Sequence, residues 1–161
     1  MTANPPRGRE RPRKFLVVVD KTPECHVAVR FATRRAQATG GRVTLLCAMQ
    51  PADIQQWRGV EEIMKDEARQ EAESLIYAAA KVVNDLSGIV SELVIGDGRS
   101  VDCLLDLIKN DKDVSILVLA ASTAKEGPGP LVSMVAGASQ YPIPVTIVPG
   151  ALNDDAIDAL A

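Results

Sequence analysis

Two short segments hold the residues of this chain that are best suited to ligand chemistry. The first is Asp20-Lys21-Thr22, which directly follows an apolar run. The second spans residues 122–130, Ser-Thr-Ala-Lys-Glu-Gly-Pro-Gly-Pro, and combines two hydroxyls, one lysine and two glycines. Hydroxyl groups, an ammonium and a glycine-rich backbone are typical of sites that bind phosphate or carboxylate groups. The two segments form one candidate site if the fold brings them together.

The second segment also has a defect as a phosphate site. Pro128 and Pro130 have no N–H to donate, and Glu126 adds negative charge. The remaining donors are of two kinds. They are the side chains of Ser122, Thr123 and Lys125, and the backbone amides at the start of the helix that is expected to follow, up to Ser133. Such a site has room for one phosphate or carboxylate. It predicts that a triphosphate binds weakly or not at all.

Two further motifs resemble functional sites but have the wrong spacing or geometry. Gly96-Asp97-Gly98 would need a third glycine at Val101 to match a dinucleotide-binding loop, so we interpret it as a tight turn with positive φ. Cys25 and His26 are adjacent in a predicted helix, where neighbouring side chains point about 100° apart. We therefore predict no catalytic residue.

Composition excludes several classes of protein. A single histidine and three widely spaced cysteines (Cys25, Cys47 and Cys103) argue against a metal site and favour a reducing, cytoplasmic compartment. No apolar run approaches the ~18 residues of a membrane span, and no secretory signal is predicted. Only five residues are aromatic, which argues against a platform for single-stranded nucleic acid.

Charge is unevenly distributed along the chain. Five basic residues and one glutamate give the first 14 residues a net charge of +4, whereas the whole chain carries −3, so the remainder carries −7. An acidic body repels nucleic acid and acidic lipid, so we interpret the basic segment as a solvated arm.

Five segments rich in apolar or β-branched residues are predicted as buried strands: residues 15–19, 43–48, 89–95, 114–119 and 145–148. Four of them lack the alternation of a half-exposed strand, which is typical of a parallel sheet covered by helices on both faces. The third is more mixed and suits an edge of the sheet.

Segments with helical periodicity lie between the strands and start near residues 22, 60, 100 and 131. Thr22 and Ser100 are predicted as N-caps, and Gly40 is predicted to end the first helix. The second helix is expected to end near residue 84 and the fourth near residue 140. Alternation of strand and helix predicts a three-layer α/β/α fold with a doubly wound, five-stranded parallel sheet.

One domain is expected at residues 14–150, preceded by a flexible basic arm at residues 1–13 and followed by a tail at residues 151–161. Two alternatives stay open for the tail: a short helix capped by Asn153, or a frayed terminus without regular structure.

Several of these segments resemble the universal stress protein family. The similarity is carried by Phe15-Leu-Val-Val-Val-Asp20-Lys-Thr22-Pro, by Val94-Ile-Gly-Asp-Gly98, by Val114–Ser122 and by Pro142-Ile-Pro-Val-Thr-Ile-Val-Pro149. The resemblance covers about residues 14–150. It implies strand order 3-2-1-4-5, a Rossmann-like fold of the adenine nucleotide α-hydrolase-like type, and a homodimer paired through the last strand, at Val145, Thr146, Ile147 and Val148.

The resemblance also implies a ligand site at Asp20 and Thr22, and at Ala121, Ser122, Thr123, Lys125, Gly127, Gly129 and Ser133. In nucleotide-binding members, the aspartate after the first strand contacts the adenosine end. Asp20 occupies that position, although a purely structural turn role is equally open. The glycine motif after the fourth strand, G-x2-G-x9-G-[S/T], is only half matched, with Ala124 and Ala138 at two of its four positions.

Three functions follow from these observations. The favoured one is a non-enzymatic, homodimeric stress-response protein of the cytoplasm with weak or absent nucleotide binding and no required cofactor. The second is an ATP- or AMP-binding member that acts as a nucleotide-dependent switch, with weak ATP hydrolysis left open. The third is a small nucleotide hydrolase or transferase, which lacks a convincing nucleophile and base in this sequence.

Overall fold

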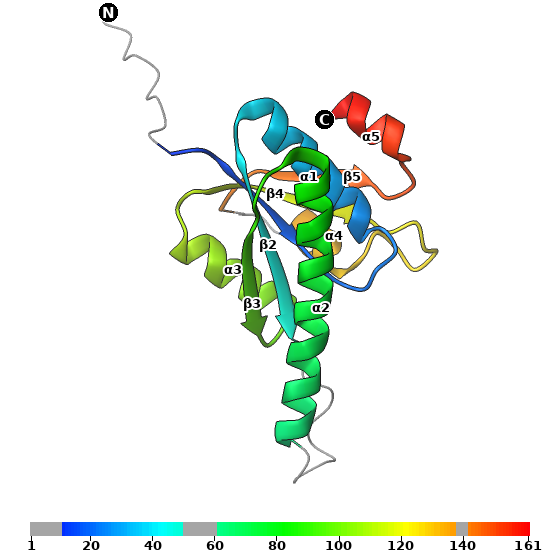
Figure 1. The fold of residues 1–161 in the computed structure, drawn as a ribbon. Helices are drawn as coiled ribbons and strands as arrows, with labels where there is room; N and C mark the ends of the chain where they lie inside the picture. Colours follow the sequence, from blue (N-terminus) through cyan, green and yellow to red (C-terminus); the bar gives the residue numbers. More distant parts are fainter. Residues whose placement is uncertain (1–10, 50–60, 138–141) are drawn as a thin grey trace, which may run out of the picture.

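The computed structural model describes residues 11–49, 61–137 and 142–161 and shows strands and helices in strict alternation (Figure 1). Of the expected basic arm, only residues 11–13 belong to the described residues. The ten elements are β1(Lys14–Val18), α1(Cys25–Thr39), β2(Arg42–Met49), α2(Glu61–Ser87), β3(Glu92–Asp97), α3(Ser100–Asn110), β4(Val114–Ala121), α4(Pro130–Gly137), β5(Val145–Pro149) and α5(Asp154–Leu160).

The strands form one parallel sheet with the order β3-β2-β1-β4-β5, which confirms the predicted order and fold class. Side chains of β1 alternate between two apolar clusters. Phe15 and Val17 pack with residues of α1 and α2, whereas Leu16 and Val18 pack with residues of α3 and α4. Burial on both faces explains why the strands are apolar without alternation.

The helix ends differ from the predictions at two N-termini. Glu24, not Thr22, is the N-cap of α1, and Arg99, not Ser100, is the N-cap of α3. Neither cap is made by a side chain. The hydroxyl and the amide of Thr22 both donate to the carboxylate of Asp20, so this side chain belongs to the turn before the helix. The predicted end of α1 is confirmed, since Gly40 adopts φ 66° and its N–H bonds to Ala36 O.

The third strand begins later than predicted, at Glu92 rather than at residue 89. Ile89 belongs to the turn after α2, where its amide donates to the hydroxyl of Ser87. Val90 is 85% exposed, whereas Ile89 packs against the core, so only part of this apolar segment is buried. The fourth helix is described only as far as Gly137, and its predicted end near residue 140 lies outside the described residues.

The C-terminal tail forms a helix that packs against α1 (Figure 1). Asn153 caps it, because its side-chain oxygen accepts a hydrogen bond of 2.8 Å from Ala156 N. Ile157 is fully buried in the cluster on the α1 side of the sheet. Asp158 accepts hydrogen bonds from Arg30 at 2.7 and 2.8 Å and from Arg34 at 3.1 Å.

Opposite charges meet at the amino end of the sheet. Lys14 is 7% exposed and forms ion pairs with Glu92 and Asp111. Arg11 and Arg42 lie within ion-pair distance of Asp113. The charges at this end are therefore largely matched. Among the described helices, none combines the length and the apolar character that a bilayer crossing requires.

The ion pairs of Asp158 predict a specific dependence of stability on pH. Hydrogen bonds from Arg30 and Arg34 lower the pKa of Asp158 from 3.8 to about 2. Because the folded pKa is depressed, the stabilisation is complete above the unfolded pKa and is lost as pH falls through the folded value. Asp158→Asn should therefore lower urea-unfolding stability at pH 6. The difference from wild type should shrink below about pH 4; a difference as large at pH 2 as at pH 6 would contradict this assignment.

Candidate functional site

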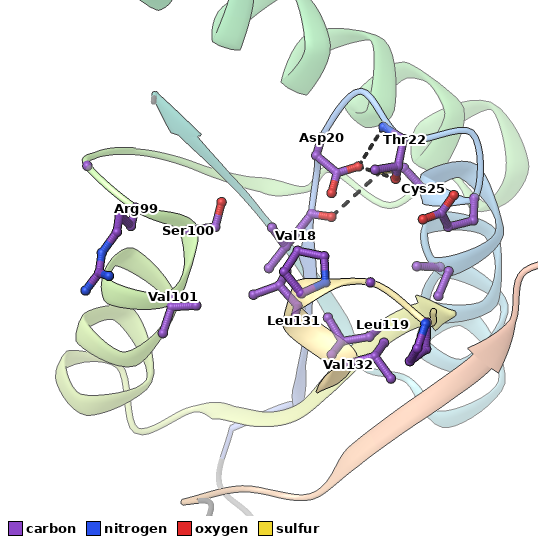
Figure 2. A pocket seen from close by; sticks show the side chains of 17 residues that line it. Val18, Asp20, Thr22, Cys25, Arg99, Ser100, Val101, Leu119, Leu131 and Val132 are labelled. Carbon is purple, nitrogen blue, oxygen red and sulfur yellow. Dashed lines mark hydrogen bonds between the residues drawn. The ribbon is translucent and has the colours of Figure 1, made fainter. Parts of the chain in front are cut away.

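The carboxyl ends of β1 and β4 lie next to each other, but their chains turn to opposite faces of the sheet. Residues after β1 lead into α1 on one face, and residues after β4 lead into α4 on the other. A crevice at such a switch point is the usual ligand site of open α/β sheets. A cavity of about 630 Å³ lies there, a volume typical of small-molecule pockets (Figure 2).

The cavity has apolar side chains within it and polar groups at its margins. Val18, Leu119, Leu131 and Val132 provide much of the apolar surface. Asp20 and Thr22 lie on one side, and Arg99 and Ser100 come from the opposite side (Figure 2). In most small-molecule sites, a small number of polar groups around an apolar surface fixes the orientation of the ligand.

Asp20 acts in the turn that follows β1. Its Oδ1 accepts a hydrogen bond from Thr22 N at 3.0 Å and another from the Thr22 hydroxyl. These bonds hold the carboxylate at the rim of the cavity. The structural role of Asp20 in the turn is thus present. Its Oδ2 has no partner among the described residues, and a contact of this oxygen with a ligand stays a prediction.

The loop between β4 and α4 uses many of its amides internally. Ser122 N donates to Pro128 O at 3.0 Å, Ala124 N donates to the Ser122 hydroxyl at 3.1 Å, and Gly127 N donates to Ala124 O at 3.3 Å. Gly127 and Gly129 have φ of 118° and 102°, which glycine adopts without strain. The loop therefore closes on itself rather than presenting a continuous row of donors.

Three amides that border the cavity are left for a ligand. Within the described part of the chain, Gly129 N, Leu131 N and Val132 N have no acceptor, and all three residues line the cavity. Ser133 N is already bonded to Gly129 O at 2.9 Å. The first turn of a helix favours an anion, so the amides of Leu131 and Val132 suit one phosphate or carboxylate oxygen pair.

The structure brings only some of the predicted site residues to the cavity. Asp20, Thr22 and Gly129 line it. The other predicted positions belong to the neighbouring loop or helix and do not line it: Ala121, Ser122, Thr123, Lys125, Gly127 and Ser133. Lys125 and Glu126 are both exposed. Contact of these residues with a ligand stays a prediction.

Sequence reasoning missed the contribution of the turn between β3 and α3. Gly98, Arg99, Ser100 and Val101 line the cavity, although β3 is two strands away from β1. Gly98 has φ 110°, which confirms the predicted turn, and its amide donates to Met49 O at 3.1 Å. The glycine pair was the available signal, because a turn at a carboxyl strand end is a candidate ligand contact in any parallel sheet.

Arg99 is the cation within this turn, but its charge is already paired with that of Asp102. Its Nε lies 3.0 Å from Asp102, and both side chains are well exposed. By contrast, Asp20 and Glu24 line the cavity and have no ion-pair partner among the described residues. The cavity therefore offers few fixed positive charges to a polyphosphate.

Cys25 lies in the cavity wall without the features of a nucleophile. Burial raises the pKa of its thiol to about 11, and the carboxylates of Asp20 and Glu24 act in the same direction. Its Sγ lies 3.8 Å from Val18 O. His26 is exposed, with Nδ1 2.6 Å from Pro23 O, so that ring nitrogen is occupied by the backbone. Cys25 and His26 therefore do not form a catalytic pair.

A smaller cavity of about 320 Å³ adjoins the first beneath α2. Asp20 and Ser100 line both cavities, and an ion pair between Lys21 and Glu71 lies at the second one. Within the described residues, no group of three His, Cys, Asp or Glu side chains is placed to hold a metal ion.

Comparison with known families agrees with this architecture. A family model described as "Universal stress protein family" matches residues 12–149. This chain belongs to the universal stress protein family. No curated protein gives a significant match to the sequence.

Solved structures of universal stress proteins share the fold at low identity. UspA from Lactobacillus plantarum is 19% identical, with a TM-score of 0.71 over 86% of this chain and 98% of that chain. A protein from Archaeoglobus fulgidus, described in complex with dAMP, is 18% identical (TM-score 0.60; 84% and 97%). A family protein from Arabidopsis thaliana, described with AMP bound, is 16% identical (TM-score 0.61; 86% and 92%).

Burial predicts that Cys25 reacts slowly with disulfide reagents in the folded protein, because the thiolate that reacts is scarce when the pKa is about 11. Modification at pH 8, followed by peptide mass spectrometry, should show little labelling of Cys25 until the protein is unfolded in urea. Rapid labelling of Cys25 alone in the native protein would instead indicate an activated thiol.

Proposed function

We propose that this universal stress protein acts as a homodimer through binding rather than catalysis, and that its cavity holds a small ligand but binds a triphosphate weakly or not at all. The observation that carries this proposal is the use of the β4–α4 loop amides within the loop itself. A polyphosphate needs several donors that converge on its oxygens, and among the described residues that line the cavity on this side only Gly129 and the start of α4 supply free amides.

Prolines strengthen this argument. Pro128 and Pro130 both line the cavity, at the place where a phosphate-binding loop would present amides, and neither has one. Glu126 and the unpaired carboxylates of Asp20 and Glu24 oppose negative charge nearby. A single anionic group at Leu131 and Val132 stays compatible with this arrangement.

The case against catalysis rests on the side chains around the cavity. A covalent mechanism needs a nucleophile within hydrogen-bond reach of a base. Burial raises the pKa of the Cys25 thiol, and His26, the single histidine of the chain, turns one ring nitrogen to Pro23 O. Neither residue supports the hydrolase or transferase alternative.

A nucleotide-dependent switch is the second candidate, favoured by the relatives described with AMP and dAMP. Those ligands carry one phosphate, which matches the two unpartnered amides at the start of α4. In this alternative the base would lie near Asp20, and the phosphate would accept from Leu131 N and Val132 N. AMP would then bind better than ATP, the reverse of what a polyphosphate cradle gives.

The homodimer proposal rests on β5 at the end of the sheet. β5 pairs with β4 on one side, and no described strand pairs with its other side. Its sequence is apolar, and Ile147 is 42% exposed. An uncovered apolar edge strand favours pairing with another chain, and a second copy of β5 would satisfy it.

Calorimetry tests the ligand proposal. Titration with ATP and magnesium should give a Kd no tighter than about 0.1 mM, because few amides reach the phosphates. Pro128→Ala restores one amide at the cavity and should improve the affinity for AMP or ATP by up to about tenfold. Pro142→Ala, at an exposed proline remote from the cavity, is the matched control. A low-micromolar Kd of the wild-type protein for ATP would overturn the proposal.

Light scattering tests the dimer. The wild-type protein should have twice the mass of one chain, and Ile147→Lys should give single chains, because each interface would then hold two ammonium groups close together. Val90→Lys, at an exposed residue before β3 at the opposite end of the sheet, should leave the dimer intact. A wild-type monomer, or a dimer that tolerates the change at Ile147, would refute pairing through β5.

A further inference from the structure

The C-terminal segment, residues 150–160, lies beyond the part of the chain that matches the family model, which ends at residue 149. We call it the C-terminal clasp. It is nevertheless joined closely to the rest of the molecule. Ile157 is fully buried, Leu152 packs against the same cluster, and Asp158 is held by two arginines. A segment held this firmly needs an explanation in terms of what it contacts.

The clasp is attached to the same helix that forms one wall of the cavity. Cys25 and Ala28 in the first turns of α1 line the cavity, together with the N-cap Glu24. Arg30 and Arg34, one and two turns further along, hold Asp158. Figure 1 shows α5 beside this helix. Because a helix moves largely as a rigid unit, a shift of α1 at the clasp also shifts its end at the cavity.

A second contact joins the clasp to the cavity more directly. A Cβ added to Gly150 would collide with Ala121 O and would come within 3.1 Å of Glu24 Cβ. Ala121 is the last residue of β4, immediately before the β4–α4 loop, and Glu24 lines the cavity. The first residue of the clasp is therefore packed between two segments that border the site.

We propose that the C-terminal clasp controls the cavity: docking of α5 holds the α1 wall in its binding position, and ligand in the cavity in turn stabilises the docked clasp. The proposal rests on the proposed binding role of the cavity and adds its regulation. Coupling between two sites is reciprocal, so each event must favour the other by the same factor. The two states are α5 docked on α1 and α5 released, with the buried Ile157 as the contact that distinguishes them.

Labelling of Cys25 tests the proposal without any ligand. Asp158→Asn removes the charge that Arg30 and Arg34 bind and should increase the rate at which Cys25 is modified by about fivefold or more, the low end of coupling between sites. Asp85→Asn, which breaks the exposed Lys81–Asp85 pair in α2, away from the cavity, is the matched control and should leave the rate unchanged. Ile157→Ala, which removes the buried contact of α5, should act in the same direction as Asp158→Asn.

Cys47 separates local release from general unfolding, because it is buried in β2 and does not line the larger cavity. A faster reaction of Cys25 with Cys47 unchanged supports the clasp. An unchanged rate at Cys25 in both α5 variants, or a rise shared equally by Cys47, overturns it. These outcomes do not depend on which ligand the cavity holds, so they stand apart from the calorimetric test.

AMP supplies the reciprocal measurement. If AMP binds the wild-type protein, hydrogen exchange of the α5 amides should slow at saturation, and Asp158→Asn should weaken AMP binding relative to Asp85→Asn. Binding of AMP without any change in α5 exchange overturns the coupling. If AMP does not bind, the labelling experiment alone decides the clasp, and the failure belongs to the proposed ligand.

Discussion

The central strand β1 must be buried on both faces, and this constraint arranges much of the molecule. Leu16 and Val17 are fully buried, one facing α3 and α4 and the other facing α1 and α2. The connections from β1 and β4 run in opposite directions along the sheet, which places α1 on one face and α4 on the other. That divergence separates the turn at Asp20 from the loop at Ser122 and creates the cavity between them. The arrangement of helices that buries β1 therefore also creates the candidate site.

Much of the fold could be predicted from the sequence because burial on both faces leaves a plain pattern. Residues 15–19 and 116–121 are apolar without interruption, and Gly40 marks a helix end through its left-handed φ. Strand order came from the family resemblance and not from the pattern itself. The N-cap at Thr22 was wrong because α1 begins later, after Glu24, and the Thr22 side chain bonds to Asp20 in the turn before it. Such a short turn between strand and helix is not visible in residue spacing.

The candidate site was only partly predictable. Asp20 and Gly129 follow strands that adjoin in the sheet, so strand order alone places them together. Ser100 and Arg99 follow β3, and they reach the cavity because α3 crosses back over the sheet toward β4. Strand order does not predict which amides of the β4–α4 loop are free to bind a ligand. Proline positions showed which donors are missing, but only the structure shows that Ser122 N and Gly127 N are occupied.

Gly150 has a consequence for how chains of this family vary. The end of β4 approaches this residue so closely that any side chain would strike the carbonyl of Ala121. A homologous chain that continues past the last strand into a helix folded back on α1 must accommodate the same approach. An appended helix that folds back in this way should therefore occur together with a glycine at its junction, whereas chains that leave the last strand in another direction are free to carry any residue there.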